Sequence, residues 1–209
     1  MAVVCVIAVL LLGAGSRMTA DRVMQQTAVL ESADRAKALQ ADHYEPVEVV
    51  ESKYALDSLY AGLNVEGETV GYVGQTTVSG FGGPIEVTAG VDNEGTITGI
   101  SVGGSQFAET EGLGALTREA AFTDQFVGKK PTITLNEGGV DTVTAASTTS
   151  RAVVSGVNNI ARYIYAEQLG IAEEEAGPYA GQTISATEQG FGGDVTVTVG
   201  LFLTAFISK

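Results

Sequence analysis

A short segment rich in hydroxyl groups is the part of this 209-residue sequence that could do chemistry. Residues 141–150 read Asp-Thr-Val-Thr-Ala-Ala-Ser-Thr-Thr-Ser and lead directly into a segment whose apolar residues recur with helical spacing. Because the first amides of a helix lack partners and carry partial positive charge, they stabilise a bound phosphate. A hydroxyl at that point could hydrogen-bond a phosphate or be esterified to it. The simpler alternative is an N-cap, supplied by Thr149 or Ser150.

The composition excludes several other kinds of site. With Cys5 as the one cysteine and His43 as the one histidine, intrachain disulfides, Fe–S clusters, thiolate zinc sites and multi-histidine metal centres are excluded. The hydroxyl-rich loop has no lysine and no glycine-rich cradle, so it is not an ATP-binding P-loop. Acidic residues outnumber basic ones by 25 to 11, giving a net charge of −14, which argues against nucleic acid as a partner. A cofactor must therefore carry any redox or group-transfer chemistry.

Residue periodicity predicts the elements that position this loop. From residue 69 onward β-branched and small residues alternate, with turn signals at residues 80–83 and 92–95, which predicts three antiparallel strands. Residues 113–127 return to helical spacing, which ends near Pro131, and residues 132–135 are predicted as a short strand. After the loop, an amphipathic helix is indicated by an apolar stripe made of Val153, Val157, Ile160 and Ile164.

The two ends of the chain carry further signals. Residues 2–15 form an uncharged apolar run, and we expect residues 1–18 to be an uncleaved membrane anchor, with a cleaved signal peptide as the alternative. Residues 19–50 are predicted as a connecting helix. An acidic linker at residues 171–178 precedes a partial repeat at residues 179–209.

The repeat is visible as matching strings in the same order. Tyr-Val-Gly-Gln-Thr at residues 72–76 returns as Tyr-Ala-Gly-Gln-Thr at residues 179–183, and Gly-Phe-Gly-Gly at residues 80–83 returns at residues 190–193. We expect strands that either mark an incomplete second copy or extend the first sheet, because two strands alone are marginally stable. The predicted fold is α+β: an anchor helix, a twisted, mainly antiparallel sheet packed with helices, and a partial C-terminal repeat of the first strands.

Four motifs, in a fixed order, resemble those of the FMN-binding domain family. That family includes the G subunit of the Rnf complex and the C subunit of the sodium-translocating NADH:quinone oxidoreductase. Residues 141–147 resemble its Asp-x-x-(Ser/Thr)-Gly-Ala-(Thr/Ser) flavinylation motif. The others are Gly83-Pro84-Ile85 followed by the turn at residues 92–97, Glu-Thr-Glu-Gly-Leu-Gly at residues 109–114, and Gln-Phe-x-Gly-Lys at residues 125–129.

The resemblance implies an FMN-binding domain at residues 51–170 and FMN bound as a phosphoester to Ser147, with Thr148 as the runner-up acceptor. Asp141 corresponds to the motif aspartate that the family's flavin-attaching transferase recognises. The sequence departs from the family in having Ala145 in place of the usual glycine, Ser147 in place of the commoner threonine, and Glu111 in place of a proline. The residues predicted to bind the cofactor are Asp141, Thr144, Ala145, Ala146, Ser147, Thr148, Glu109, Thr110, Leu113 and Gly114.

By this resemblance, the chain is expected to be the flavin-carrying electron-transfer subunit of an Rnf-like, ion-translocating oxidoreductase, with no catalytic site of its own. Its expected partners are the other membrane subunits and, during maturation, the transferase. Its expected location is the cell membrane, with a single span and the soluble domain on the extracytoplasmic face. Two alternatives stay open: a stand-alone exported flavoprotein of an extracellular electron-transfer chain, and a non-redox exported binding module. The Phe81 and Phe191 rings could stack on a flavin, although packing against the sheet is the simpler expectation.

Overall fold

A computed structural model describes residues 30–136, 138–171, 182–190 and 193–201 of the chain. The predicted anchor at residues 1–18 and nearly all of the acidic linker lie outside these residues. In the part of the chain that the structure describes, none of the helices reaches the length and apolar character that crossing a bilayer requires.

The centre of the fold is an antiparallel five-stranded sheet in which each strand pairs with its neighbours in sequence, in the order β1-β2-β3-β4-β5. The strands are β1 (His43–Val47), β2 (Ser58–Leu63), β3 (Thr69–Ser79), β4 (Pro84–Asp92) and β5 (Ile97–Gly103). The two predicted turns close the β3–β4 and β4–β5 hairpins, with Gly80 N–H donating to Gly83 O and Gly95 N–H donating to Asp92 O. The three strands predicted from residue 69 onward are therefore confirmed.

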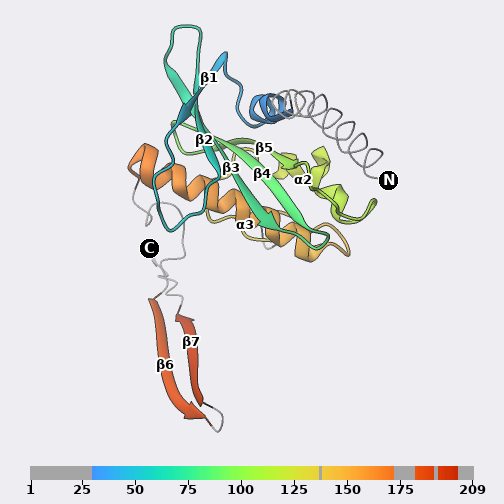
Figure 1. The fold of residues 1–209 in the computed structure, drawn as a ribbon, viewed down its shortest axis with the longest axis vertical. Helices are drawn as coiled ribbons and strands as arrows, with labels where there is room; N and C mark the ends of the chain where they lie inside the picture. The colour runs from blue at the N-terminus through green and yellow to red at the C-terminus, as the bar shows by residue number, and fades with distance from the viewer. Residues whose placement is uncertain (1–29, 137, 172–181, 191–192, 202–209) are drawn as a thin grey trace, which may run out of the picture.

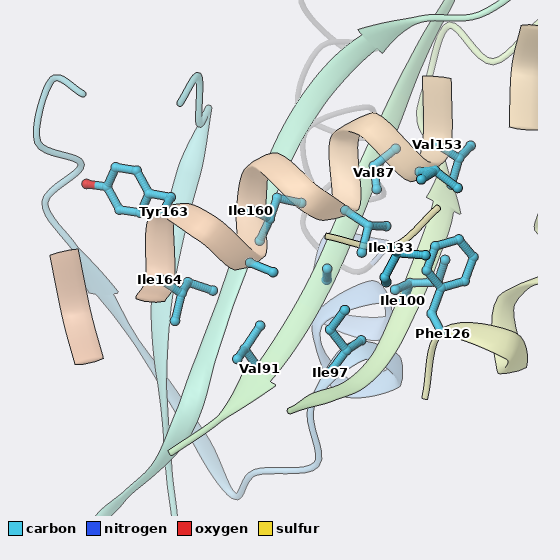
Figure 2. Close-up of a cluster of buried hydrophobic side chains, with 14 of the residues drawn as sticks. Val87, Val91, Ile97, Ile100, Phe126, Ile133, Val153, Ile160, Tyr163 and Ile164 are labelled. Carbon is cyan, nitrogen blue, oxygen red and sulfur yellow. The ribbon is translucent and has the colours of Figure 1, made fainter. Parts of the chain in front are cut away.

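One face of the sheet is covered by the long helix α3 (Ser147–Tyr163), which lies across the strands (Figure 1). The apolar stripe predicted for this helix is confirmed, because Val153, Val157, Ile160 and Ile164 are all fully buried. Figure 2 shows Val153, Ile160 and Ile164 among the strand residues that they pack against, including Val87 and Val91 of β4. This core fixes the direction of α3 and hence the place where its first turn begins.

The opposite face of the sheet carries the helical residues 30–38. A Cβ atom at Gly90 would overlap the carbonyl oxygen of Ala38, so the backbone of this helix lies directly on β4. Thr98 Oγ1 on β5 donates to the same carbonyl at 2.6 Å, and Ser101 Oγ donates to Asp34 Oδ1 at 2.6 Å. The sheet is thus the middle layer of three, and its antiparallel strands make the fold α+β.

The helix predicted over residues 19–50 ends earlier than expected. Helical backbone stops at residue 38, and residues 43–47 form the edge strand β1 instead. Pro46 lies within that strand, and a proline there cannot continue a helix. The tail of the predicted connecting helix therefore belongs to the sheet, where β1 pairs with β2.

The segment predicted as one helix over residues 113–127 is three short turns. These are the 3-10 helix η1 (Gly114–Arg118), the one-turn α2 (Ala120–Thr123) and the 3-10 helix η2 (Asp124–Phe126). Glu119 has an extended backbone at φ −76° and ψ 150°, which interrupts the helix after η1. Only the second half contributes side chains to the hydrophobic core, where the buried rings of Phe122 and Phe126 meet edge to face at 5.5 Å.

The short strand predicted at residues 132–135 is also wrong. Thr132 has a left-handed φ of 75°, and Leu135 makes only an isolated bridge to Val140. The side-chain amide of Asn158 takes the place of a neighbouring strand, accepting from Ile133 N–H at 2.9 Å and donating to Ile133 O at 2.8 Å. After α3 the chain continues as a π-helical turn, η3 (Ile164–Leu169), and Gly170 ends it in a left-handed conformation.

The C-terminal strands β6 (Gln182–Gly190) and β7 (Gly193–Leu201) form a two-stranded sheet of their own. Their hairpin has the register of β3–β4: Gln189 pairs with Asp194 across the turn, just as Ser79 pairs with Pro84. The expectation that these strands extend the first sheet is wrong for the described residues. That residues 179–209 are an incomplete second copy stays a prediction.

Candidate functional site

A cleft of about 320 Å³ lies where three separate segments meet. The β3–β4 turn contributes Phe81, and the start of η1 with the segment before it contributes Glu109, Thr110, Leu113 and Gly114. The third segment is the end of the hydroxyl-rich loop together with the first turn of α3. The lining residues are Phe81, Glu109, Thr110, Leu113, Gly114, Ala145, Ala146, Ser147, Thr148 and Thr149. A volume of this size is within the range that holds small-molecule ligands and cofactors.

The hydroxyl-rich loop ends in the first turn of α3, whose first helical residue is Ser147. Ser147 and Thr148 are exposed and line the cleft, whereas Thr149 and Ser150 are buried. The N-cap is Ala146, so the expected capping role of Thr149 or Ser150 is wrong: both hydroxyls lie inside the first turn. The first amides of an α-helix have no intrahelical partner, and here they lie beside two exposed hydroxyl groups.

Ser150 stabilises this arrangement from inside. Its hydroxyl donates to Ala146 O at 3.0 Å and accepts from Val143 N–H at 3.1 Å, which ties the loop to the helix. Ala145 adopts a left-handed backbone with φ 61°, a conformation that a residue with a Cβ rarely takes. The family motif has glycine at this position. The strained turn therefore occurs where the resemblance places it, and it turns the chain from the loop into α3.

Glu109 is the buried charged residue of the cleft, with 8% of its surface exposed. Its Oε1 accepts hydrogen bonds from Phe81 N–H at 2.8 Å and from Gly82 N–H at 3.0 Å. Its Oε2 accepts a hydrogen bond from Thr149 Oγ1 at 3.0 Å. One carboxylate thus joins the β3–β4 turn to the first turn of α3.

Eight of the ten residues predicted to bind the cofactor meet in this cleft, and two do not line it. The eight are Glu109, Thr110, Leu113, Gly114, Ala145, Ala146, Ser147 and Thr148. The other two, Asp141 and Thr144, are exposed on the loop before the helix. Asp141 is held through its backbone, because its N–H donates to Gln125 Oε1 at 2.8 Å while Gln125 Nε2 donates to Ala121 O at 2.9 Å.

Two lining residues were missed by sequence reasoning. Thr149 was considered only as a cap, and Phe81 was expected to pack against the sheet, but 79% of Phe81 is exposed at the cleft. The available signal was the position of this phenylalanine between glycines in a tight turn. Glu111, which replaces the family proline, lines a different cavity, on the side of η1 toward residues 30–37.

The side chains that line the cleft fit a flavin mononucleotide. Phe81 and Leu113 supply exposed apolar surface, 79% and 40% exposed respectively, against which a flat ring system can pack. Ser147 and Thr148 supply hydroxyls at the positive end of a helix, where a phosphate is stabilised. The cleft therefore pairs an aromatic-binding part with a phosphate-binding part.

Comparison with known proteins agrees with this assignment. A family model described as FMN-binding domain matches residues 80–162, a range that includes every residue lining the cleft. The chain is 35% identical over 136 residues to the G subunit of the ion-translocating oxidoreductase complex of Methanosarcina acetivorans, covering 62% of this chain and 71% of that protein.

Two further relatives are shorter matches. The G subunit of the Na(+)-translocating ferredoxin:NAD(+) oxidoreductase complex of Acetobacterium woodii is 36% identical over 119 residues, covering 52% of this chain and 56% of that protein. The G subunit of the proton-translocating ferredoxin:NAD(+) oxidoreductase complex of Clostridium ljungdahlii is 33% identical over 96 residues, covering 43% of this chain and 51% of that protein. The chain thus spans about half the length of these two relatives.

Solved structures of related shape include the C subunit of the Na(+)-translocating NADH-quinone reductase of Parabacteroides distasonis, at 23% identity and a TM-score of 0.48, covering 64% of this chain and 80% of that one. Another is NqrC of Shewanella oneidensis, at 19% identity and a TM-score of 0.42, covering 60% of this chain and 66% of that one. The sequence matches, rather than these structures, decide the assignment. This chain belongs to the family of G subunits of ion-translocating, Rnf-type oxidoreductase complexes and carries that family's FMN-binding domain.

Proposed function

We propose that this chain is an electron-transfer subunit of a membrane ion-translocating oxidoreductase and that it carries FMN as a phosphoester on Ser147. The observation that supports this most directly is the position of Ser147: it is the first residue of α3, it is exposed, and it lines the cleft. When bound, FMN supplies the redox chemistry, while the protein supplies binding and orientation. A covalent bond keeps the cofactor from being lost outside the cytoplasm.

The attachment needs an oxygen nucleophile and a stabilised phosphate. Ser147 Oγ forms a bond to the flavin phosphorus, and its proton leaves with the group displaced from that phosphorus. The donor must therefore be a flavin whose 5′-phosphate already carries a leaving group as a phosphoanhydride. The unpartnered amides at the start of α3 stabilise the phosphate charge. Thr148 is the runner-up acceptor, because it is also exposed and lines the same cleft.

Asp141 and Thr144 have a different role in this proposal. Both are exposed on the loop and neither lines the cleft, so they are positioned for recognition by the flavin-attaching transferase rather than for contact with the flavin. The hydrogen bond from Asp141 N–H to Gln125 keeps the start of the loop fixed to η2. The transferase would then meet an ordered loop that presents Asp141 and Ser147 together.

The proposed location is the cell membrane, with residues 1–18 as a single span and the flavin domain on the extracytoplasmic face. The proposed partners are the other membrane subunits of an Rnf-like complex. The relatives named above are subunits of multi-subunit ion-translocating complexes, which supports such partners. Co-purification of polytopic membrane proteins with the full chain from its native membrane tests this part.

A stand-alone exported flavoprotein is the second candidate. The observation that favours it is the β6–β7 hairpin, which has the register of β3–β4 and carries the same Gly-Phe-Gly-Gly sequence at residues 190–193. A repeat of these strands suits a carrier built from tandem flavin-binding copies. Loss of all membrane partners during purification, with the flavin retained, would support this candidate over membership of a complex.

Covalent flavin is tested by in-gel fluorescence after denaturation, using the full chain expressed with and without a flavin-attaching transferase. We expect a fluorescent band only with the transferase, lost in Ser147→Ala and kept in Thr148→Ala. Ser147→Thr is the matched control, since it keeps the nucleophilic oxygen and should keep the band. Fluorescence that survives Ser147→Ala and disappears in Thr148→Ala would move the acceptor by one residue.

A further inference from the structure

Phe81 is held at the cleft by an unusual combination of a fixed backbone and an exposed ring. We propose that Glu109 is a positioning residue that holds the Phe81 ring as an aromatic cover over the flavin cleft. The proposal rests on the proposed function, since it names the flavin ring as the occupant that Phe81 contacts. It assigns Glu109, which sequence reasoning placed among the flavin-binding residues, a role in shaping the cleft.

Most of the hydrogen-bonding capacity of the Glu109 carboxylate is used within the protein, since a carboxylate offers about four acceptor sites. It accepts three hydrogen bonds, two from the turn amides of Phe81 and Gly82 and one from the Thr149 hydroxyl. A Cβ atom at Gly80 or at Gly114 would overlap its oxygens, so a side chain at either position would displace the carboxylate. The buried charge is stabilised by donors from the protein itself, as a buried carboxylate requires.

These hydrogen bonds fix the backbone from which the Phe81 ring projects. Gly80 N–H donates to Gly83 O at 2.8 Å and closes the turn, while Glu109 holds the two amides inside it. The second oxygen of Glu109 binds Thr149, which is two residues after Ser147 on the first turn of α3. The same side chain therefore sets the distance between the Phe81 turn and the proposed acceptor.

The exposure of Phe81 indicates what the turn is built to hold. With 79% of its surface exposed, the ring forgoes most of the free energy that burying a phenylalanine yields. The ring lines the cleft together with Ser147 and Thr148 rather than packing on the sheet. Aromatic rings pack favourably on one another, and a flavin attached at Ser147 brings a flat aromatic surface into this cleft.

Tryptophan fluorescence tests the cover, because the chain has no tryptophan of its own. Phe81→Trp gives a single reporter, measured in the full chain with and without attached flavin. We expect flavin attachment to lower its emission at least about twofold and to lower its quenching by iodide, because stacking shields the indole. The Ser147→Ala form of the same reporter, expressed with the transferase, should keep the emission of the flavin-free protein.

Two substitutions at Glu109 separate the effect of its side-chain length from the effect of its charge. Glu109→Gln keeps the length and can still accept from the turn amides, whereas Glu109→Asp keeps the charge but is one methylene shorter. In flavin-free protein, we expect amide exchange at Phe81 and Gly82 to stay near wild type in Glu109→Gln. In Glu109→Asp it should speed up at least about tenfold, as expected when a hydrogen bond to a charged acceptor is lost. Glu111→Asp is the matched control, since Glu111 is exposed and outside the cleft lining.

The outcomes distinguish this proposal from the proposed function. If Glu109→Asp exchanges like the wild type, the positioning role is wrong, whether or not flavin attaches. If attached flavin leaves the emission of Phe81→Trp unchanged, the proposal that the ring at position 81 covers the flavin is wrong. The proposal that flavin binds in the cleft is then unaffected. If no flavin attaches to the wild-type chain, the proposed function fails, and the exchange data still decide what Glu109 does.

Discussion

Ala145 shows how one residue sets the direction of the proposed acceptor, Ser147. Its φ of 61° turns the chain so that α3 begins at Ser147 and the exposed hydroxyl lines the cleft. A left-handed backbone costs an L-residue roughly 1–2 kcal/mol, a cost that glycine does not bear. The protein therefore keeps a strained residue at the junction of its functional loop and its longest described helix.

Ala145→Gly should stabilise the protein by about 1 kcal/mol, because glycine relieves the left-handed strain but also loosens the unfolded chain. Denaturant unfolding of the full chain measures the change. Ala152→Gly, inside α3, is the matched control and should destabilise by about 0.5–1 kcal/mol. Equal destabilisation by both substitutions would show that Ala145 bears no strain.

At the residue scale, sequence motifs could predict most residues that line the site, but not the contacts that those residues make. The loop at residues 141–150 and the segment at residues 109–114 were expected together, and most of their predicted residues line one cleft. The role of Glu109 depends on hydrogen bonds to Phe81 and Thr149, which lie 28 and 40 positions away in the sequence. No local sequence pattern encodes such contacts. Phe81 was misjudged because an exposed aromatic ring is not the outcome that hydrophobicity favours.

The contact between the helical residues 30–38 and the sheet depends on the absence of a side chain at Gly90. Gly90→Ala should destabilise the protein by about 1–3 kcal/mol, since the new methyl group would push the Ala38 carbonyl away and disturb its bond from Thr98. Thermal or denaturant unfolding measures this. Gly103→Ala is the matched control, because the added methyl meets only ordinary contacts there. Similar losses from both would remove the case for close helix–sheet approach.

Tyr165 joins η3 to the β4–β5 turn, where its hydroxyl donates to Gly95 O at 2.7 Å. Burial raises the pKa of this phenol, and the negative charge of Asp92 raises that pKa further. Because the folded-state pKa lies above the unfolded value of about 10, the stability from neutral Tyr165 is complete below pH 10. It is lost as pH rises through the folded pKa, at up to about 1.4 kcal/mol per pH unit.

Unfolding free energies measured between pH 9 and 12 test this slope, with the pH limits set around the ordinary tyrosine pKa of about 10. Tyr165→Phe should flatten the loss of stability at high pH, while costing about 1 kcal/mol at neutral pH through the missing hydrogen bond. Asp92→Asn keeps the Oδ1 acceptor for Glu94 N–H and Thr96 N–H. It should lower the folded-state pKa of Tyr165, so the loss of stability should be smaller and should end at lower pH. An unchanged slope in Tyr165→Phe would assign the alkaline loss to other groups.

At the element scale, strong periodicity was a reliable guide and weak periodicity was not. The strands from residue 69 and the stripe of α3 were predicted because alternation and 3.6-residue spacing were sustained over many residues. The single helix predicted over residues 113–127 is wrong because only Phe122 and Phe126 of this stretch belong to the hydrophobic core, so the rest follows local turns. The edge strand β1 forms through pairing with β2, a contact that cannot be predicted from its own five residues.

At the scale of the whole molecule, the net charge of −14 bears on the redox potential. Adding electrons to a flavin near an acidic surface adds negative charge, which that surface disfavours, so the midpoint potential should be lowered. Salt screens such charges, with a Debye length of about 10 Å at 0.1 M. We therefore expect the midpoint potential of the flavin-loaded chain to rise with ionic strength in a redox titration. Free FMN is the control, and a shift no larger than its own would contradict the idea.

The central claim is that the oxygen at the start of α3 carries the flavin. The most direct measurement is the intact mass of the chain purified from a host that has the transferase, followed by mass mapping of its peptides. We predict a mass increase equal to FMN less one water, located on the peptide that contains residues 141–150, with Ser147 as the modified residue. An unmodified chain from that host, or a flavin attached to a different peptide, would contradict the account.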